Sequence, residues 1–196
     1  MLHPPGTVLH NPLTAEWGRL LEASPERIVA EAISTPAGGV RVRHRHPQQT
    51  ESFEVLAGEL TVVLDGETRV FGPGARAIIS PGVAHCWTST GGEPLYARLT
   101  MSPALEFLDS IAAMWGLCAL GRAHPDGSPR PLDAVLLAEA FTNDIQLCSP
   151  PPALQKAAAR ILGSLIRATG RSVTNPTVLQ AAIVEPDRWP GALARQ

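Results

Sequence analysis

The sequence has little of what marks the more specialised classes of protein. It contains only three cysteines in 196 residues, and Cys86, Cys118 and Cys148 are far apart, which fits neither a disulfide framework nor a cysteine-rich zinc site. Lys156 is the only lysine, and the formal net charge is −2. We therefore expect no nucleic acid as a partner, because nucleic-acid binding depends on many Lys and Arg side chains that neutralise phosphates.

Long apolar segments are also missing. No uncharged run reaches the roughly 18 apolar residues that a membrane-spanning helix needs. The first six residues have neither the basic start nor the apolar stretch of a secretory signal. We therefore expect a soluble, cytoplasmic globular protein with no membrane partner. A chain of 196 residues is long enough for one domain with a smaller extension, and it can bury enough surface to fold without a metal or a disulfide.

The first half of the chain consists of short β-type runs separated by turns rich in Gly and Pro. Asp65-Gly66, between two such runs, is a strong hairpin signal, because a type I′ turn needs positive φ at both central residues. Many short strands at regular spacing indicate an all-β sandwich or barrel and do not suggest alternating β-α units. We expect the barrel to occupy residues 1–101, with its core at about 25–100.

Beyond this barrel, apolar residues recur at steps of three and four, as they do on helices. Ser102-Pro103 is typical of a helix start, with Ser as the N-cap and Pro in the first helical position. Asp133 can cap a second helix, and three prolines at 150–152 precede a third, whose Leu and Ile residues form one apolar stripe. We expect these stripes to pack against the β unit or against a second copy of the chain.

The last part of the chain has a different character. No periodicity continues beyond residue 170, and Pro176, Pro186 and Pro190 interrupt the sequence. We therefore expect a helical extension over residues 102–170 and an extended or poorly ordered tail over residues 171–196.

Three of the six histidines belong to one arrangement of chemically active residues, and two of these lie two positions apart. Side chains alternate between the two faces of a strand, so His44 and His46 share a face with Val40 and Val42. Two apolar residues that lead into two imidazoles suit the inside of a barrel. The three arginines at the intervening positions share the other face, which suits contact with water.

Glu51 follows these histidines with the opposite parity, so an unbroken strand would point it outward. Pro47 argues against an unbroken strand, because proline cannot donate a hydrogen bond to a neighbouring strand. A turn or bulge over residues 47–50 would reset the alternation. Glu51, Phe53 and Val55 would then face the inside of the barrel, and the candidate site depends on this inference.

A later segment supplies a third imidazole. Pro81-Gly82 indicates a tight turn into a strand whose inward face carries His85 and Trp87. A carboxylate that points inward among imidazoles is costly to bury unless a cation balances its charge. Nitrogen and oxygen donors together suit a first-row divalent metal. The candidate metal ligands are His44, His46, Glu51 and His85.

These residues resemble the two motifs of the cupin superfamily. The first motif, which is Gly, His-x-His, Glu and Gly at fixed spacing, is filled by Gly38, His44, His46, Glu51 and Gly58. The second motif, which is Gly, Pro-x-Gly, His and Asn, is matched by Gly74, Gly82 and His85, with Ser80 in the place of its proline and Ser89 in the place of its asparagine. The asparagine is not normally a metal ligand.

The resemblance covers about residues 25–100. It implies a mainly β fold, the double-stranded β-helix or jelly-roll barrel, followed here by a small α-helical segment. It also implies that the two histidines, the glutamate and the later histidine hold a metal. The segments that flank the barrel are similar to those of a common bacterial single-barrel subgroup whose activity is largely unassigned. Cupins commonly pair, so we expect a homodimer, which would cover open sheet edges.

Several assignments stay open. The three histidines among the candidate ligands have an alternative interpretation as residues of an ordinary core. Trp87 can line a substrate cavity or simply fill the barrel. Tyr96 and Arg98 share one face of a strand and would orient a substrate anion only if that face points inward.

The candidate site narrows the chemistry without choosing it. Fe, Mn, Ni, Cu and Zn all remain open as the divalent transition metal, and no other cofactor and no further catalytic residue is indicated. One hypothesis is a small metal-dependent oxygenase or isomerase that acts on a small oxygenated organic molecule. The other is a non-catalytic protein that binds a small ligand, with a metal that is structural or anchors that ligand. A ligand-sensing regulator is disfavoured, because no DNA-binding helix-turn-helix is evident.

Overall fold

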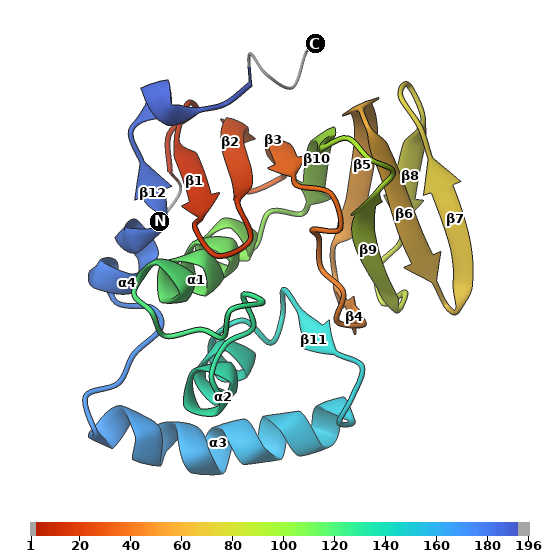
Figure 1. Cartoon of the computed structure of the whole chain (residues 1–196). Helices are drawn as coiled ribbons and strands as arrows, with labels where there is room; N and C mark the ends of the chain where they lie inside the picture. The colour runs from red at the N-terminus through yellow and green to blue at the C-terminus, as the bar shows by residue number, and fades with distance from the viewer. Residues whose placement is uncertain (1–2, 192–196) are drawn as a thin grey trace.

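The computed structural model describes residues 3–191, which form two antiparallel sheets with helices packed against one end (Figure 1). The strands are β1 (Val8–Asn11), β2 (Glu16–Ala23), β3 (Ile28–Ser34), β4 (His44–Arg45), β5 (Thr50–Ala57), β6 (Glu59–Leu64), β7 (Glu67–Phe71), β8 (Arg76–Ile79), β9 (His85–Thr90), β10 (Leu95–Ser102), β11 (Gln146–Leu147) and β12 (Ile183–Val184). The helices are α1 (Phe107–Ala119), α2 (Pro131–Ala140), α3 (Pro152–Ala168), α4 (Pro176–Ala181) and the short 3-10 helix η1 (Pro186–Arg188).

The two sheets face each other as the walls of a barrel. One has seven strands in the order β12-β1-β2-β3-β10-β5-β8, and the other has five in the order β11-β4-β9-β6-β7. The predicted hairpin joins β6 to β7, and Asp65 and Gly66 have φ values of 47° and 95°. The predicted mainly β fold, a double-stranded β-helix barrel, is therefore confirmed.

The barrel core lies between the two sheets. Phe53 and Val55 of β5 and Leu60 and Val62 of β6 are at most 2% exposed and belong to one apolar cluster. They occupy alternate positions, as inward-facing residues on strands do. Full burial of each such side chain stabilises the fold by roughly 1.5–3 kcal/mol.

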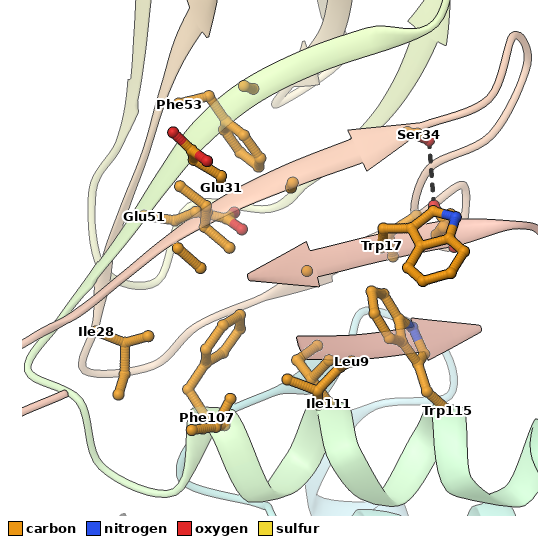
Figure 2. Close-up of a pocket in the computed structure, with 18 of the residues that line it drawn as sticks. Leu9, Trp17, Ile28, Glu31, Ser34, Glu51, Phe53, Phe107, Ile111 and Trp115 are labelled. Atoms are coloured by element: carbon orange, nitrogen blue, oxygen red, sulfur yellow. Dashed lines mark hydrogen bonds between the residues drawn. The ribbon is translucent and has the colours of Figure 1, made fainter. Parts of the chain in front are cut away.

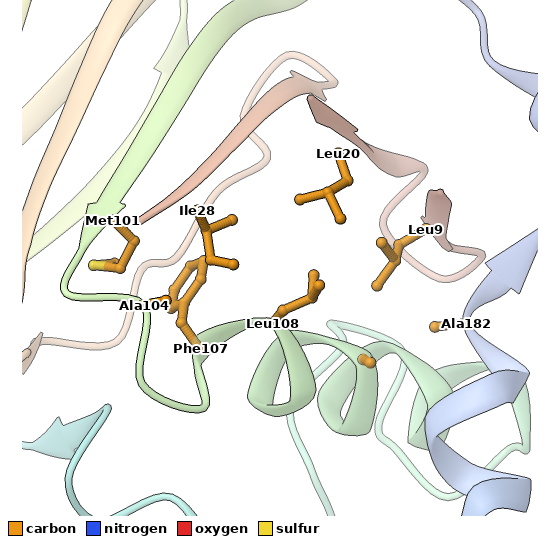
Figure 3. Close-up of a cluster of buried hydrophobic side chains, with 9 residues drawn as sticks. Leu9, Leu20, Ile28, Met101, Ala104, Phe107, Leu108 and Ala182 are labelled. Atoms are coloured by element: carbon orange, nitrogen blue, oxygen red, sulfur yellow. The ribbon is translucent and has the colours of Figure 1, made fainter. Parts of the chain in front are cut away.

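A second core joins the barrel to α1. Leu20 of β2 and Ile28 of β3 pack with Leu108 and Ala112 of α1, and Figure 3 shows α1 running below these strands. The helix therefore covers the end of the barrel that the first three strands leave open. This position brings α1 close to the candidate site.

Helix α1 begins later than the sequence predicts. Ser102 still pairs with Thr50 of β5 and donates a hydrogen bond of 2.9 Å to the Glu26 carbonyl, so it cannot act as the N-cap. The helix begins at Phe107 instead. None of the helices within residues 3–191 is long and apolar enough to cross a bilayer.

Helix α3 has the predicted extent, but its apolar stripe does not pack against the described part of the chain. Ile161 and Leu165 are 68% and 65% exposed. The helix contacts α2 through its small and buried residues instead. Gly163 leaves room for the Glu139 carboxylate of α2, because a Cβ at Gly163 would lie 2.2 Å from one of its oxygens.

The expectation of an extended or poorly ordered tail over residues 171–196 is wrong where the structure describes this segment. Asn175 caps α4 by accepting a hydrogen bond from the Val178 amide, and β12 pairs with β1. Buried Ala182 joins the core beneath β1 and β2. The tail is ordered because its apolar residues fill the end of this core; residues 192–196 lie outside the described range.

Candidate metal centre

The structure brings the four predicted ligands together inside the barrel. His44 lies on β4, His46 directly follows it, Glu51 lies on β5, and His85 begins β9. One ligand atom from each residue lies within 4.8 Å of the others. All four residues are at most 3% exposed. Their convergence is therefore a property of the folded barrel and does not depend on neighbouring positions in the chain.

Glu51 faces inward because the chain changes sheets after His46. Strand β4 belongs to the five-stranded sheet and β5 to the seven-stranded sheet, so the turn at Pro47 resets the alternation of side chains. The predicted inward face is confirmed from His44 onward but is wrong at Val42, which is 54% exposed. Regular strand geometry begins only at His44, so strict alternation fails at Val42, although Val40 lines the cavity that adjoins the cluster.

The turn before β9 sets the position of His85. Gly82 has a φ of 79°, and its amide donates a 2.8 Å hydrogen bond to the His46 carbonyl. His85 then pairs with His44 across neighbouring strands, and their ring centroids are 4.2 Å apart. The Pro81-Gly82 turn thus ties the backbones of two candidate ligands together.

Each imidazole is oriented by a backbone carbonyl. The Nδ1 atom of His44 lies 2.8 Å from the Val42 oxygen, and that of His85 lies 3.0 Å from the Val83 oxygen. The Nδ1 atom of His46 lies 2.5 Å from the Asp144 oxygen. Donation from Nδ1 leaves each Nε2 as the atom with a free lone pair, which is the arrangement that metal-binding histidines usually have.

A metal ion fits the atoms that remain. The Nε2 atoms of His46 and His85 and the Oε2 atom of Glu51 are buried and have no hydrogen-bond partner of suitable geometry. Glu51 Oε2 lies 2.9 Å from the Nε2 atom of His85 and 3.7 Å from that of His46. Buried polar atoms without partners are rare in native proteins, and a divalent cation would satisfy all three.

At three of the four residues, His44, His46 and Glu51, the electrostatics favour the protonation state that a metal requires. Burial and the nearby His85 lower the pKa of His44 to about 4, and burial also lowers the pKa of His46. Burial would raise the pKa of Glu51, but contact with His85 and the other imidazoles outweighs it and holds this pKa below its usual value. Burial would lower the pKa of His85, but Glu51 raises it. Glu51 is therefore anionic, whereas His44 and His46 are neutral.

The sequence gives no signal for the residues that support this cluster. Asp144, in the loop between α2 and β11, accepts a 2.8 Å hydrogen bond from the Glu106 amide just before α1. The fully buried Gln49 donates to the Pro103 and Ala104 carbonyls. The helical extension therefore supports two candidate ligands: β11 pairs with β4, the strand that carries His44, and the Asp144 carbonyl holds the ring of His46.

A cavity of about 130 Å³ adjoins the cluster. His44, His46 and Glu51 line it together with apolar residues of β3 and α1. Figure 2 shows Phe107 on one side of Glu51 and Trp17 and Trp115 farther along. Trp87 lines the cavity and also packs on Phe53, with ring centroids 5.3 Å apart.

Arg98 does not take part in this site. Its guanidinium forms a 3.0 Å ion pair with Glu54, and both side chains are more than one-third exposed. Of the two interpretations of the face that carries Tyr96 and Arg98, the outward one is therefore correct for Arg98.

Comparisons with known proteins match part of the chain. Residues 33–101 match the family model of the cupin domain. An RmlC-like cupin from Shewanella frigidimarina is 20% identical, with 50% of this chain and 85% of that chain covered and a TM-score of 0.45. An uncharacterized conserved protein with a double-stranded β-helix domain from Klebsiella pneumoniae is 21% identical, with coverage of 45% and 76% and a TM-score of 0.41. A sugar phosphate isomerase from a cupin superfamily, from Silicibacter pomeroyi, is 20% identical, with coverage of 44% and 59% and a TM-score of 0.40. No curated protein matches the sequence.

Proposed function

Because residues 33–101 match the family model of the cupin domain, we propose that the protein is a metal-dependent enzyme, dioxygenase-like or isomerase-like, that acts on a small oxygen-bearing organic molecule. One observation carries the proposal: the buried atoms without partners on His46, Glu51 and His85 belong to a cluster that lines an apolar cavity. A metal held there would supply Lewis acidity or, if it is redox-active, bring O₂ and a substrate together.

The protein's own residues have distinct roles in this proposal. His44, His46, Glu51 and His85 would hold the ion, and the carbonyls that accept from their Nδ1 atoms fix the rings. The apolar walls exclude water, which strengthens electrostatic interactions at the cluster. The substrate would lie in the cavity with an oxygen toward these ligands.

The cavity favours the oxygenase version over the isomerase version. An isomerase needs a group that moves a proton, and the two other carboxylates that line the cavity are already engaged. Glu16 accepts hydrogen bonds from Ser34, Gly39 and Thr14, and Glu31 pairs with Arg19 at 2.5 Å. An oxygenase needs less from the protein's own acids and bases, because a metal held by the four candidate ligands would supply the activation of O₂.

The same observation supports a second candidate, a non-catalytic ligand-binding protein. The described lining residues outside the cluster offer no free acid or base, so the site has the features of a binding pocket. Water exchange at the bound metal, measured by relaxation of water protons in the Mn²⁺ form, separates the two functions. A metal with no exchangeable water favours the binding protein.

The first test is elemental analysis of protein purified without an affinity tag. We expect about one equivalent of a transition metal. We expect Glu51→Gln to lower metal affinity by about 100-fold or more, because loss of a ligand should cost at least as much as loss of a residue that only supports the ligands. Glu54→Gln is the matched control, because Glu54 lies on the same strand but faces outward to Arg98. Equal metal content in both variants would contradict the proposed ligand set.

The second test addresses the reaction. Oxygen consumption is measured for the Fe, Mn, Ni and Cu forms with diketones, flavonols and single-ring phenols. Consumption that requires both metal and substrate supports an oxygenase. No consumption with any metal form would contradict it.

A further inference from the structure

The cavity next to the cluster is unusually rich in aromatic residues. The chain has nine Trp, Tyr and Phe residues, and five of them line this one cavity. The five are Trp17, Phe53, Trp87, Phe107 and Trp115. They come from β2, β5, β9 and α1. Aromatic side chains attract a ring edge-to-face or by offset stacking, beyond the effect of area burial, so the lining favours a cyclic, unsaturated ligand.

The volume of the cavity limits the size of that ligand. It is about 130 Å³, close to the roughly 150 Å³ of an engineered apolar cavity that binds benzene. One six-membered ring with small substituents fits this space. Ligands with three fused or linked rings exceed this volume, so they would have to protrude from the cavity or displace its walls.

The charge of the lining limits the class further. Among the described lining residues there is no lysine or arginine. A phosphate or carboxylate placed away from the cluster would thus lose its hydration without gaining a cation, and an isolated buried anion is strongly disfavoured. The carboxylate of Glu16, which accepts hydrogen bonds from three neutral donors, adds negative charge and reinforces this exclusion, whereas Arg19 balances the charge of Glu31.

The remaining polar contact for a ligand is the cluster itself. Ser34 donates its hydroxyl hydrogen to Glu16 at 3.2 Å, as the dashed line in Figure 2 shows. Glu16 is held by two further hydrogen bonds, so neither residue is a free partner. A bound molecule would place its oxygen toward His44, His46 and Glu51 and its hydrocarbon part among the aromatic rings.

From these observations we infer that the ligand is an uncharged molecule with a single six-membered ring that carries at least one oxygen substituent. The inference rests on the proposed function, since it names the substrate class of that same site. It adds a selection against anionic groups distal to the cluster and against larger ring systems.

The test compares three probes that share adjacent oxygen atoms. Binding of catechol, 3,4-dihydroxybenzoate and the three-ring flavonol quercetin is measured by calorimetry and ligand-observed NMR with zinc-loaded and metal-free protein. We expect catechol to bind, dihydroxybenzoate to bind at least about 30-fold more weakly because of its buried carboxylate, and quercetin to show no saturable binding. Equal affinity for all three would overturn the inference.

A cavity-filling variant locates the binding. Ala32 lines the cavity from β3, and Ala32→Leu adds three carbon atoms that would occupy it. We expect catechol affinity to fall by about 10-fold or more, since overpacking leaves no room for the ring. Ala157→Leu is the matched control, because Ala157 is exposed on α3. Unchanged affinity in a folded Ala32→Leu protein would place catechol elsewhere and contradict the inference.

A cavity-enlarging variant provides an independent measurement. Trp115→Ala removes one wall, and we expect it to bind the two-ring compound 2-naphthol at least about 10-fold more tightly than the unmodified protein does. If Trp115→Ala bound 2-naphthol no more tightly than the unmodified protein does, Trp115 would not set the size limit of the cavity.

The results separate this inference from the proposed function. Catechol binding that Ala32→Leu abolishes, in a protein that takes up no metal, would support the inference and contradict the metal-dependent enzyme. Metal uptake with no binding of any single-ring probe would contradict the inference and leave the metal centre supported.

Discussion

At the scale of single residues, the candidate site is a set of side chains whose burial makes sense only together. His44 and His46 would be ordinary buried imidazoles without Glu51, and Glu51 would be an uncompensated buried charge without them. Backbone carbonyls orient the Nδ1 atoms of both rings, and the Nε2 atom of His46 is buried without a hydrogen-bond partner. This arrangement makes the stability of the metal-free protein sensitive to pH.

His44 gives a direct prediction about this sensitivity. Burial lowers its pKa from 6.5 to about 4 in the folded state, so the unfolded chain binds this proton first as the pH falls. The folded protein therefore keeps the stability that neutral His44 provides above pH 6.5 and loses it as the pH falls toward 4. Between pH 7 and pH 5 we expect metal-free protein to lose about 2 kcal/mol more stability than His44→Gln does.

Urea unfolding at the two pH values, with a chelator present, measures this difference. His124→Gln is the control, because His124 is exposed and lies outside the cluster. It should behave as the unmodified protein does. An identical pH response of His44→Gln and the unmodified protein would show that His44 is not buried in its neutral form.

At the scale of elements, the barrel and the helical extension form one site. The loop that carries Asp144 supplies the carbonyl next to the His46 ring, and β11 pairs with the strand that carries His44. Asp144 is itself held by the amide that precedes α1. The position of the His46 ring therefore depends on how the extension is docked.

Asp144 is accordingly a positioning residue. Asp144→Ala removes the Oδ1 acceptor of the Glu106 amide and loosens the loop, so we expect metal affinity to fall by about 10-fold. Asp144→Asn keeps an oxygen at the same position and should restore most of the affinity. Competition with a chelating dye measures this without an activity assay. Equal affinity of the Ala and Asn variants would refute the role, and Asp126→Ala, in an exposed loop, controls for general effects.

The contrast between Glu51 and Asp144 explains how far the sequence could predict the site. Glu51 could be predicted because it lies within a spaced motif, where strand alternation and one turn decide its direction. Asp144 contacts a ring 98 positions away in the sequence, and such a contact depends on tertiary packing that no local pattern encodes. The strands β11 and β12 escaped prediction for the same reason, because two residues form a strand only where a partner edge is present.

The docking of the helices depends on another buried carboxylate. Asp133 of α2 is fully buried and bonds to Arg122, which follows α1, and to Arg171, which follows α3. Burial would raise its pKa, but the bonds from Arg171 and Arg122 outweigh this and lower it. A lowered pKa in the folded state means that the stabilisation is present above pH 4 and is lost as the pH falls further.

We therefore expect Asp133→Asn to destabilise the protein by about 3 kcal/mol at pH 7, because it leaves two guanidinium groups without their charged partner. The difference from the unmodified protein should shrink below pH 4. Denaturant unfolding at pH 7 and pH 3 checks both statements. The control is Asp187→Asn, at an exposed position in η1, which should change stability little at either pH.

At the scale of the whole molecule, one face of α3 is not covered by the described part of the chain. Leu154, Ala158, Ile161, Leu165 and Ala168 follow one another at steps of four, three, four and three residues. That spacing is the heptad repeat of helices that pair with each other. Leu154, Ile161 and Leu165 are each more than half exposed. A two-fold axis would place the same stripe of a second chain against it.

We propose that this face is the interface of the expected homodimer, and Ile161→Glu tests it. Burial of a carboxylate at the centre of the stripe is unfavourable, whereas burial of each aliphatic side chain contributes roughly 1.5–3 kcal/mol. We expect light scattering after gel filtration to report a dimer for the unmodified protein at micromolar concentration and a monomer for Ile161→Glu, with metal content unchanged. Ala153→Glu adds the same charge to the first turn of α3, at an exposed position outside the stripe, and should remain dimeric. A monomeric unmodified protein would rule out the dimer, and a dimeric Ile161→Glu variant would assign it to another surface.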